Sequence, residues 1–202
     1  MVARPPSHHA RRDRAAGYCF FSSVALAAEV VNKGWGLPVV VADFGALHGD
    51  GTQAHFYDSG EVGVVSVHRY PAFPGTGSAD EVGEGAGHGL TRNMPLAGGA
   101  DDGVFCDAFE TALEEVCSQL RPAAIVLAAG FDGHNQDPVG GMALTEDGIT
   151  RLTSISVAAA ERWAHGRILS FLESGFELEA LANCARIHVE ELTKTSNHNP
   201  DK

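Results

Sequence analysis

Short strand patterns alternate with helical patterns along most of the chain, and this alternation constrains the fold more than any other feature. The strand patterns are aliphatic runs bounded by glycine, and the helical patterns repeat apolar residues every three to four positions. They predict strands at 38–44, 63–69, 123–130 and 167–173, and helices at 20–32, 101–119, 145–165 and 178–192, with a short segment of unassigned type at 93–96. Since parallel strands need crossover connections, this order predicts an α/β fold with a mostly parallel sheet.

The length of the chain bounds its organisation. With 202 residues it can build one domain with a sizeable core, but not comfortably two. We expect a single domain over residues 1–192, followed by a polar tail at 193–202. A content of 44% hydrophobic and 20% charged residues excludes disorder for most of the chain. The four cysteines lie far apart, which favours reduced, buried thiols over a disulfide framework.

Charge and hydropathy exclude several classes of partner. The formal net charge of −12 argues against direct nucleic-acid binding and suits a cationic ligand, such as a polyamine or a lysine-rich tail. The longest apolar stretches are less than half of the roughly 20 residues that a membrane-spanning helix requires. No apolar region of a signal peptide follows the first charged residue. We therefore expect a cytoplasmic protein without membrane contact.

Polar residues gather where the predicted strands end, which is the edge at which parallel α/β sheets bind ligands. The tandem His8-His9 is compatible with a proton-transferring pair and with a polar loop. Asp132 and His134, after a buried strand, are compatible with metal ligation and with a solvated loop. From the residues alone, both alternatives stay open. Surface or loop positions without a role are predicted for His55, His68, His88, His165, His188 and His198.

Eight motifs follow one another in a fixed order. They are Arg4-Pro-Pro-Ser-His-His-Ala, Gly17-Tyr-Cys-Phe-Phe, Asp43-Phe-Gly-Ala-Leu-His-Gly-Asp-Gly-Thr-Gln53, Ser66-Val-His-Arg, Phe73-Pro-Gly-Thr-Gly77, Ala129-Gly-Phe-Asp-Gly-His134, Asp137-Pro-Val-Gly-Gly and Leu172-Glu-Ser-Gly-Phe176. This series resembles the histone deacetylase family, which includes acetoin-utilisation proteins, acetylpolyamine amidohydrolases and bacterial histone-deacetylase-like amidohydrolases. The resemblance implies the three-layer arginase/deacetylase fold. It also implies a zinc hydrolase that cleaves the amide of N-acetyl-lysine or of an N-acetylated amine.

The resemblance carries the roles of the family's site residues onto this chain. The catalytic positions are His8 and His9, their orienting partners Asp43 and Asp50, and Phe176; the retained zinc ligand is Asp132, and the walls of the acetyl-lysine tunnel are Tyr18 and Phe73. A monovalent-cation site, which takes potassium, is implied at Asp43, Ser66 and Val67, together with the backbone carbonyls of residues 45 and 47.

Two departures from the family pattern fall on the reaction centre. The family motif D-x-D-x-H-H-G reads Asp43-Phe-Gly-Ala-Leu-His-Gly49 here, so Gly45 and Leu47 replace two zinc ligands with side chains that cannot donate. In an extended segment His48 points away from positions 45 and 47, and so makes an unlikely substitute. Phe176 replaces the tyrosine whose hydroxyl supports the oxyanion. We expect a degraded zinc site, with zinc weak or absent.

The third departure is length, because the family carries its first strands ahead of the motif that begins here at Arg4. We expect the strand ending at Asp43 to be left with an open edge and an uncovered apolar face, so that the chain forms a homo-oligomer or needs a partner protein. Three functions stay open. They are an inactive homologue that still binds acetylated lysine or amines, an active deacetylase with a metal site from Asp43, Asp132 and His8 or His9 or completed by a partner, and a non-catalytic scaffold.

Overall fold

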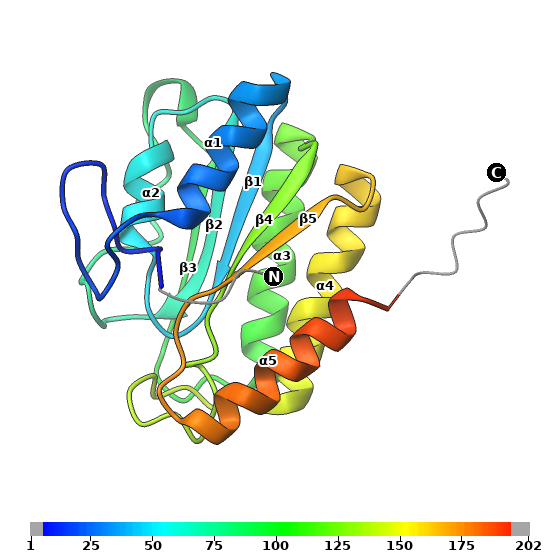
Figure 1. The fold of residues 1–202 in the computed structure, drawn as a ribbon. Helices are drawn as coiled ribbons and strands as arrows, with labels where there is room; N and C mark the ends of the chain where they lie inside the picture. The colour runs from blue at the N-terminus through cyan, green and yellow to red at the C-terminus, as the bar shows by residue number, and fades with distance from the viewer. Residues whose placement is uncertain (1–5, 195–202) are drawn as a thin grey trace, which may run out of the picture.

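The computed structural model of the chain describes residues 6–194 and contains a five-stranded parallel sheet (Figure 1). The strands are β1 (Val39–Phe44), β2 (Val62–Arg69), β3 (Thr91–Leu96), β4 (Ala124–Ala129) and β5 (Ile168–Leu172). Their order across the sheet is β3-β2-β1-β4-β5, and every neighbouring pair is parallel. The predicted α/β class and parallel sheet are confirmed.

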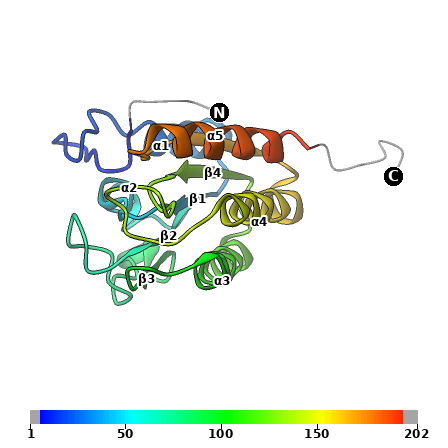
Figure 2. The ribbon, with the colours of Figure 1, turned by 90° about the horizontal axis from the view of Figure 1, so that it is seen from below.

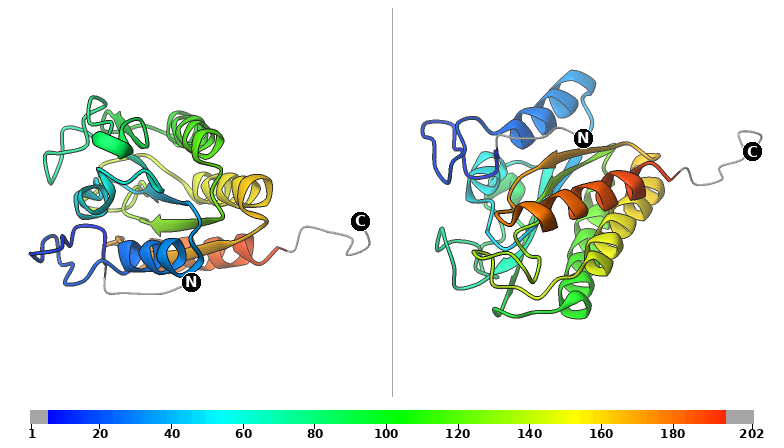
Figure 3. Two further views of the ribbon diagram at one scale, coloured as in Figure 1. Left: turned by 90° about the horizontal axis from the view of Figure 1, so that it is seen from above. Right: turned by 60° about the horizontal axis from the view of Figure 1, so that its bottom comes forward.

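Helices cover both faces of the sheet and make three layers. They are α1 (Ser23–Trp35), α2 (Asp50–Phe56), α3 (Asp102–Leu120), α4 (Glu146–Ala164) and α5 (Leu178–Leu192), with a short 3-10 turn, η1, at Gly85–Gly87. In Figure 2, α3 and α4 lie on one side of the sheet and α2 on the other, and the left panel of Figure 3 shows the same layers from the opposite end. The larger core lies between the sheet and α3, α4 and α5, and the smaller core between the sheet, α1 and α2.

The helices begin and end where local chemistry favours it. Ser22, Asp101 and Thr145 precede α1, α3 and α4, and the side chain of each accepts a backbone N–H of the first turn. Gly36 ends α1 in the left-handed conformation, with φ of +67°, which glycine adopts without steric cost. The longer helices therefore start and stop within three residues of the predicted positions.

Two short elements differ from the prediction. Helix α2 has only seven residues and contains Gly51, so its sequence carries too little apolar periodicity to identify it. Strand β3 was left without a type because Pro95 interrupts it. A proline is compatible with β3 because this strand lies at the edge of the sheet, where one side of the backbone needs no partner.

The predicted open edge at the strand ending in Asp43 is wrong. This strand is β1, the central one, which pairs with β2 on one side and β4 on the other along all of its residues. The edges of the sheet are β3 and β5. Because β1 has two neighbours, Asp43 lies in the interior of the sheet with 1% of its surface exposed.

An uncovered apolar surface is present, but it lies on α1 and the loop before it. The inner side of α1 packs Val24, Ala28 and Val31 against β1 and β4. Large apolar side chains on the outer side are between 59% and 83% exposed. This α1 apolar surface consists of Phe20, Phe21, Leu26, Val30 and Trp35. Exposed apolar groups gathered in this way are typical of interaction surfaces.

All four cysteines are free and buried, which confirms the prediction of buried thiols. Cys19 lies in the loop before α1, Cys106 and Cys117 in α3, and Cys184 in α5. Burial raises the pKa of Cys19 and Cys117 to about 12, and that of Cys106 and Cys184 to about 11.

The prediction of surface or loop positions is wrong for two histidines. His68 in β2 and His188 in α5 are both 0% exposed. His68 bonds the Ser66 hydroxyl through Nδ1 at 3.0 Å and the carbonyl of Gly77 through Nε2 at 2.9 Å. His68 and His188 can be buried because neighbouring groups hydrogen-bond both nitrogens of each ring. His88 and His165 are exposed and His55 is half-buried, as predicted, whereas His198 lies outside the described residues.

His188 links three elements of the larger core. Its Nδ1 lies 2.7 Å from the hydroxyl of Thr153 in α4, and its Nε2 lies 2.8 Å from the hydroxyl of Ser170 in β5. The rings of Phe44 and Phe131 pack against it with centroids 6.2 and 5.6 Å away. Burial in this environment lowers the pKa of His188 to about 4.

Acid should therefore destabilise the chain in part through His188. Its folded pKa of about 4 lies below the ordinary 6.5, so between these values the unfolded state binds one more proton and stability falls as the pH falls. The slope from this group approaches about 1.4 kcal/mol per pH unit. Urea unfolding of His188→Asn should show a shallower pH dependence than the parent over this window. Equal slopes would show that His188 does not enter the folded state as a neutral ring.

Candidate functional site

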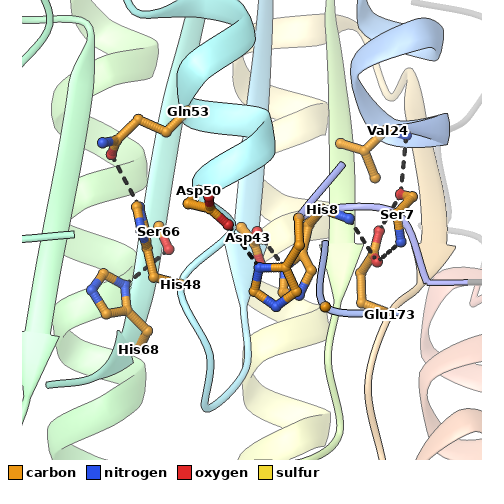
Figure 4. A network of polar contacts seen from close by, with 12 residues as sticks. Ser7, His8, Val24, Asp43, His48, Asp50, Gln53, Ser66, His68 and Glu173 are labelled. Carbon is orange, nitrogen blue, oxygen red and sulfur yellow. Dashed lines mark hydrogen bonds and ion pairs between the residues drawn. The ribbon is translucent and has the colours of Figure 1, made fainter. Parts of the chain in front are cut away.

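The candidate site lies at the carboxyl ends of the strands, where a cavity of about 790 Å³ opens. Figure 4 shows the polar residues around the tandem histidines. Side chains from the N-terminal segment and from the loops after β1, β2, β4 and β5 line it. Of the predicted site residues it contains His8, His9, Tyr18, Leu47, Phe73 and Phe176. The structure thus brings together residues that lie as far as 168 positions apart in the chain.

Each tandem histidine has a carboxylate partner. His8 Nδ1 lies 3.0 Å from Asp43 Oδ2 at the end of β1, and His9 Nδ1 lies 2.9 Å from Asp50 Oδ1 at the start of α2. Arg11 donates to the other oxygen of Asp50 at 2.8 Å. The two rings lie 4.1 Å apart, and both are almost fully buried. The carboxylates hold both rings in place through Nδ1 and, among the described residues, leave Nε2 of each ring free to face the cavity.

The two histidines differ in charge. Burial alone would lower the pKa of His8, but the carboxylate of Asp43, assisted by Glu173, outweighs it and raises the pKa to about 9. His8 is therefore an imidazolium at neutral pH. Burial lowers the pKa of His9, and the neighbouring positive His8 adds to this effect. One ring can donate a proton while the other can accept one.

Glu173, directly after β5, holds the N-terminal segment in place. It accepts hydrogen bonds from the backbone N–H of Ser7, from the Ser7 hydroxyl at 2.6 Å and from the His8 N–H at 3.1 Å (Figure 4). Its side chain is 0% exposed, and burial raises its pKa. The Ser7 hydroxyl also accepts the N–H of Val24 at the start of α1. Glu173 therefore sets where His8 enters the pocket.

The zinc position of the family centres on Asp132, after β4. Asp132 is 0% exposed; its Oδ1 accepts the Ala46 N–H at 2.8 Å, and its Oδ2 has no hydrogen-bond partner among the described residues. A Cβ atom placed on Gly45 would lie 2.9 Å from Asp132 Oδ1, so position 45 faces this carboxyl group but carries no donor. Leu47 lines the cavity with carbon atoms. These side chains do not fit zinc, which needs three protein ligands at a catalytic site.

Among the described residues, no neighbouring side chain supplies the two ligands that the family pattern has at positions 45 and 47. Within residues 6–194 no group of three His, Cys, Asp or Glu side chains is placed to hold a metal ion. Both ring nitrogens of His48 are already engaged, since Nδ1 lies 2.8 Å from the Thr76 hydroxyl and Nε2 lies 3.0 Å from Gln53 Oε1. His134 lies against Glu146, with 3.4 Å between Nε2 and the carboxylate. Asp132 and His134 are both buried, so their motif is not a solvated loop.

Phe176 occupies the position of the family's tyrosine in the cavity wall. Asp137 fixes its backbone, because Asp137 Oδ2 accepts the Phe176 N–H at 2.7 Å. The same carboxylate accepts the N–H groups of Val139 and Gly140 through Oδ1. Asp137 thus joins the loop after β4 to the loop after β5. The ring of Phe176 offers no hydroxyl for an oxyanion.

The predicted monovalent-cation residues lie side by side on β1 and β2. Asp43 is the register partner of Ser66, and Phe44 is the partner of Val67. Asp43 and Ser66 are 1% and 2% exposed, so polar groups of both strands meet in a buried place. The Ser66 hydroxyl bonds His68, and Asp43 Oδ2 bonds His8.

Sequence reasoning missed four residues of this site. Glu173 and Asp137 belong to the quoted motifs but received no role, although the place of Glu173 just after a buried strand signals a structural carboxylate. Ser7 precedes the tandem histidines, and only its contact with Glu173 reveals its function. Arg69, which also lines the cavity, is the last residue of the quoted motif Ser66-Val-His-Arg and likewise received no role.

Comparison with known proteins decides the family. Residues 1–192 match the histone deacetylase domain. The chain belongs to the histone deacetylase family. A probable deacetylase of Archaeoglobus fulgidus is 36% identical over 88% of this chain and 50% of its own length. A histone deacetylase-like amidohydrolase of Pseudomonas aeruginosa is 35% identical over 95% of this chain and 51% of its own length.

Solved structures of the histone deacetylase family have the same fold. The HDA15 HD domain superposes with a TM-score of 0.87 at 32% identity and covers 95% of this chain and 56% of that one. An acetylpolyamine aminohydrolase from Burkholderia pseudomallei superposes with a TM-score of 0.82 at 34% identity, over 94% of this chain and 54% of that one. The arginase/deacetylase fold is thereby confirmed. The chain spans about half the length of the curated relatives that it matches.

None of the described helices is both long and apolar enough to cross a membrane.

Proposed function

We propose that this chain binds an acylated lysine or amine in its cavity without hydrolysing it through zinc. The observation that carries the proposal is the placement of Gly45 and Leu47, which face Asp132 and the cavity but offer no ligand atom. Phe176 removes the oxyanion hydroxyl from the same cavity. Loss of one oxyanion donor alone typically costs about 10²–10³ in rate, and loss of two metal ligands removes the Lewis acid as well.

The cavity wall supports retained binding. Tyr18, Phe73 and Phe176 give it aromatic sides, and Leu47 and Val139 add aliphatic surface. Walls of this kind suit the alkyl chain of a lysine or a polyamine, with a few polar groups to orient the amide. His8 and His9 keep their carboxylate partners and remain available to hydrogen-bond an acyl group.

An active deacetylase built from Asp43, Asp132 and a tandem histidine has less support. Asp43 Oδ2 and His8 Nδ1 already bond each other, and Asp132 Oδ1 is bonded to the backbone of Ala46. Among the described residues, these side chains do not form a group of three that is placed to hold a metal ion. We therefore place the metal-independent binding function first, within a single domain formed by residues 1–192.

The decisive experiment measures zinc, binding and turnover on one preparation. We expect elemental analysis after dialysis against a weak chelator to find far less than one zinc ion per chain. A fluorescent acetyl-lysine peptide should bind without release of acetate. About one zinc per chain with acetate release would refute the proposal, and a zinc-free chain that binds no acyl peptide would leave the scaffold function instead.

We propose further that potassium binds beside Asp43 and Ser66. Ions that bind only the folded state raise its stability, so potassium at ten times its dissociation constant should raise the melting temperature by about 3–6 °C. Matched melts in potassium and tetramethylammonium chloride at one ionic strength should show this difference, and Ser66→Ala should reduce it. Equal melting temperatures for the parent in both salts would contradict the site.

The α1 apolar surface favours a second role in self-association. Its five side chains stand on one helix and the adjoining loop, and a second copy of the chain would remove them from water. We expect light scattering to give a mass above 21.2 kDa, the mass of one chain. Phe21→Ser with Val30→Ser should lower that mass to the monomer value. A monomeric parent would contradict this proposal without affecting the first.

A further inference from the structure

Arg69 lies at the end of β2, and its side chain forms part of the cavity wall. Its backbone N–H donates to the carbonyl of Ala46 at 3.0 Å, which places it beside Leu47, at the level of the lost zinc ligands. Two glycines make room for the side chain. A Cβ atom on Gly141 would lie 2.2 Å from Arg69 Nη1, and one on Gly98 would lie 3.6 Å from Arg69 Cδ.

The guanidinium of Arg69 forms no ion pair within residues 6–194. Its Nε is buried without a hydrogen-bond partner, and no carboxylate of the described residues lies within ion-pair distance. Six other arginines form ion pairs with carboxylates: Arg11, Arg12, Arg92, Arg151, Arg162 and Arg186. Because a half-buried charge without a partner is costly, an unpaired guanidinium in a cavity wall indicates a missing anion.

The rest of the wall does not supply that anion. Glu173 is the acidic residue of the lining, and its two oxygens already accept three hydrogen bonds from Ser7 and His8. The carboxylates of Asp43 and Asp50 are already bonded to His8 and His9. The cavity is therefore a mainly apolar chamber in which Arg69 has no anionic partner among the described residues. A planar carboxylate matches a guanidinium with two parallel hydrogen bonds.

We propose that the cavity selects an acyl group that ends in a carboxylate, such as the succinyl or glutaryl group of an acylated lysine, and that Arg69 binds this carboxylate. The proposal rests on the acyl-binding function above and specifies its ligand class. The alkyl part of the acyl-lysine lies between Tyr18 and Phe73, and its carboxylate reaches Arg69 beside Leu47. A negative terminus offsets the charge that an acetyl group would leave unpaired.

The test compares three fluorescent peptides that differ only in the acyl group on one lysine: acetyl, succinyl, and 4-methylpentanoyl, the uncharged shape match of succinyl. Fluorescence anisotropy should show the succinyl peptide binding at least about tenfold more tightly than its uncharged match. In Arg69→Met the ratio of the affinities for the succinyl and 4-methylpentanoyl peptides should fall to about one. Arg69→Lys keeps the positive charge but cannot form two parallel hydrogen bonds, so its ratio should be intermediate. Arg92→Met, on the edge strand β3, is the matched control and should retain the parent's ratio.

The outcomes separate the two proposals. Equal affinities of the parent for succinyl and 4-methylpentanoyl peptides would overturn the role of Arg69 while acyl binding stands. A succinyl preference that persists in Arg69→Met would overturn it as well, because another group would then hold the carboxylate. Failure of all three peptides to bind the parent would refute the acyl-binding function itself. Circular dichroism verifies the fold of each variant, and Arg69→Lys carries the test if Arg69→Met does not fold.

Discussion

The double variant Gly45→Asp, Leu47→His is expected to bind about one zinc ion per chain. Position 45 faces Asp132, and position 47 faces the same cavity, so the two new side chains and Asp132 would together make two carboxylates and one imidazole. Without metal, an aspartate at position 45 would bring its charge close to Asp132 and should lower the melting temperature of the variant. Zinc should reverse that loss.

Elemental analysis and thermal melts check the result. Zinc at a hundred times its dissociation constant should stabilise the variant by about 2.7 kcal/mol, which corresponds to about 5–11 °C for a chain of this size. Adding Asp132→Asn to the double variant is the control and should abolish zinc uptake. A folded double variant that takes up no more zinc than the parent would show that positions 45 and 47 do not surround the family's metal position.

Replacement of Glu173 by alanine is expected to destabilise the chain by about 3–5 kcal/mol, the range for breaking a buried charged pair from one side. The change would leave the N–H groups of Ser7 and His8 and the Ser7 hydroxyl without their acceptor in the interior. It would also remove a negative charge that offsets the His8 imidazolium. Glu173→Gln keeps one acceptor oxygen and should cost less.

Urea unfolding followed by circular dichroism measures this effect. Glu161→Ala, at an exposed position of α4, is the control and should change the free energy of unfolding by no more than about 0.5 kcal/mol. If the free energy of unfolding of Glu173→Ala lies within about 1 kcal/mol of the parent's, the hydrogen bonds of Glu173 to the N-terminal segment do not stabilise the chain as the geometry indicates. The pocket would then need another explanation for the position of His8.

The sequence predicted most of the fold because the long elements carry strong periodicity. Helices α3 and α4 begin and end within one residue of their expected limits, since each spans 19 residues with one apolar face. The sequence pattern does not predict α2, which has only seven residues, and leaves β3 without a type because Pro95 interrupts its six residues. The position of β1 at the centre of the sheet depends on strand order, which local patterns do not encode.

The candidate site was predictable where motifs supply the alignment. His8 and Asp43 are 35 residues apart, and the structure places them 3.0 Å from each other as the resemblance implied. Arg69 and Glu173 could not be assigned in this way, because an unpaired guanidinium and a carboxylate shared by three donors become visible only in three dimensions. His188 was misjudged because a histidine on an amphipathic helix resembles a surface residue until Thr153 and Ser170 are placed beside it.

Alkylation of the four buried cysteines can report local opening of the folded chain. Their raised pKa values keep all four thiols protonated in the folded state, so an alkylating reagent can modify them only after local opening. Cys19 is held in the loop beside the cavity by its contact with the Gly17 carbonyl, whereas Cys106 and Cys117 lie within the larger core. If Cys19 is alkylated faster than the other three cysteines, its labelling rate measures how often the pocket wall opens. A ligand that holds the wall closed should then slow the labelling of Cys19 only.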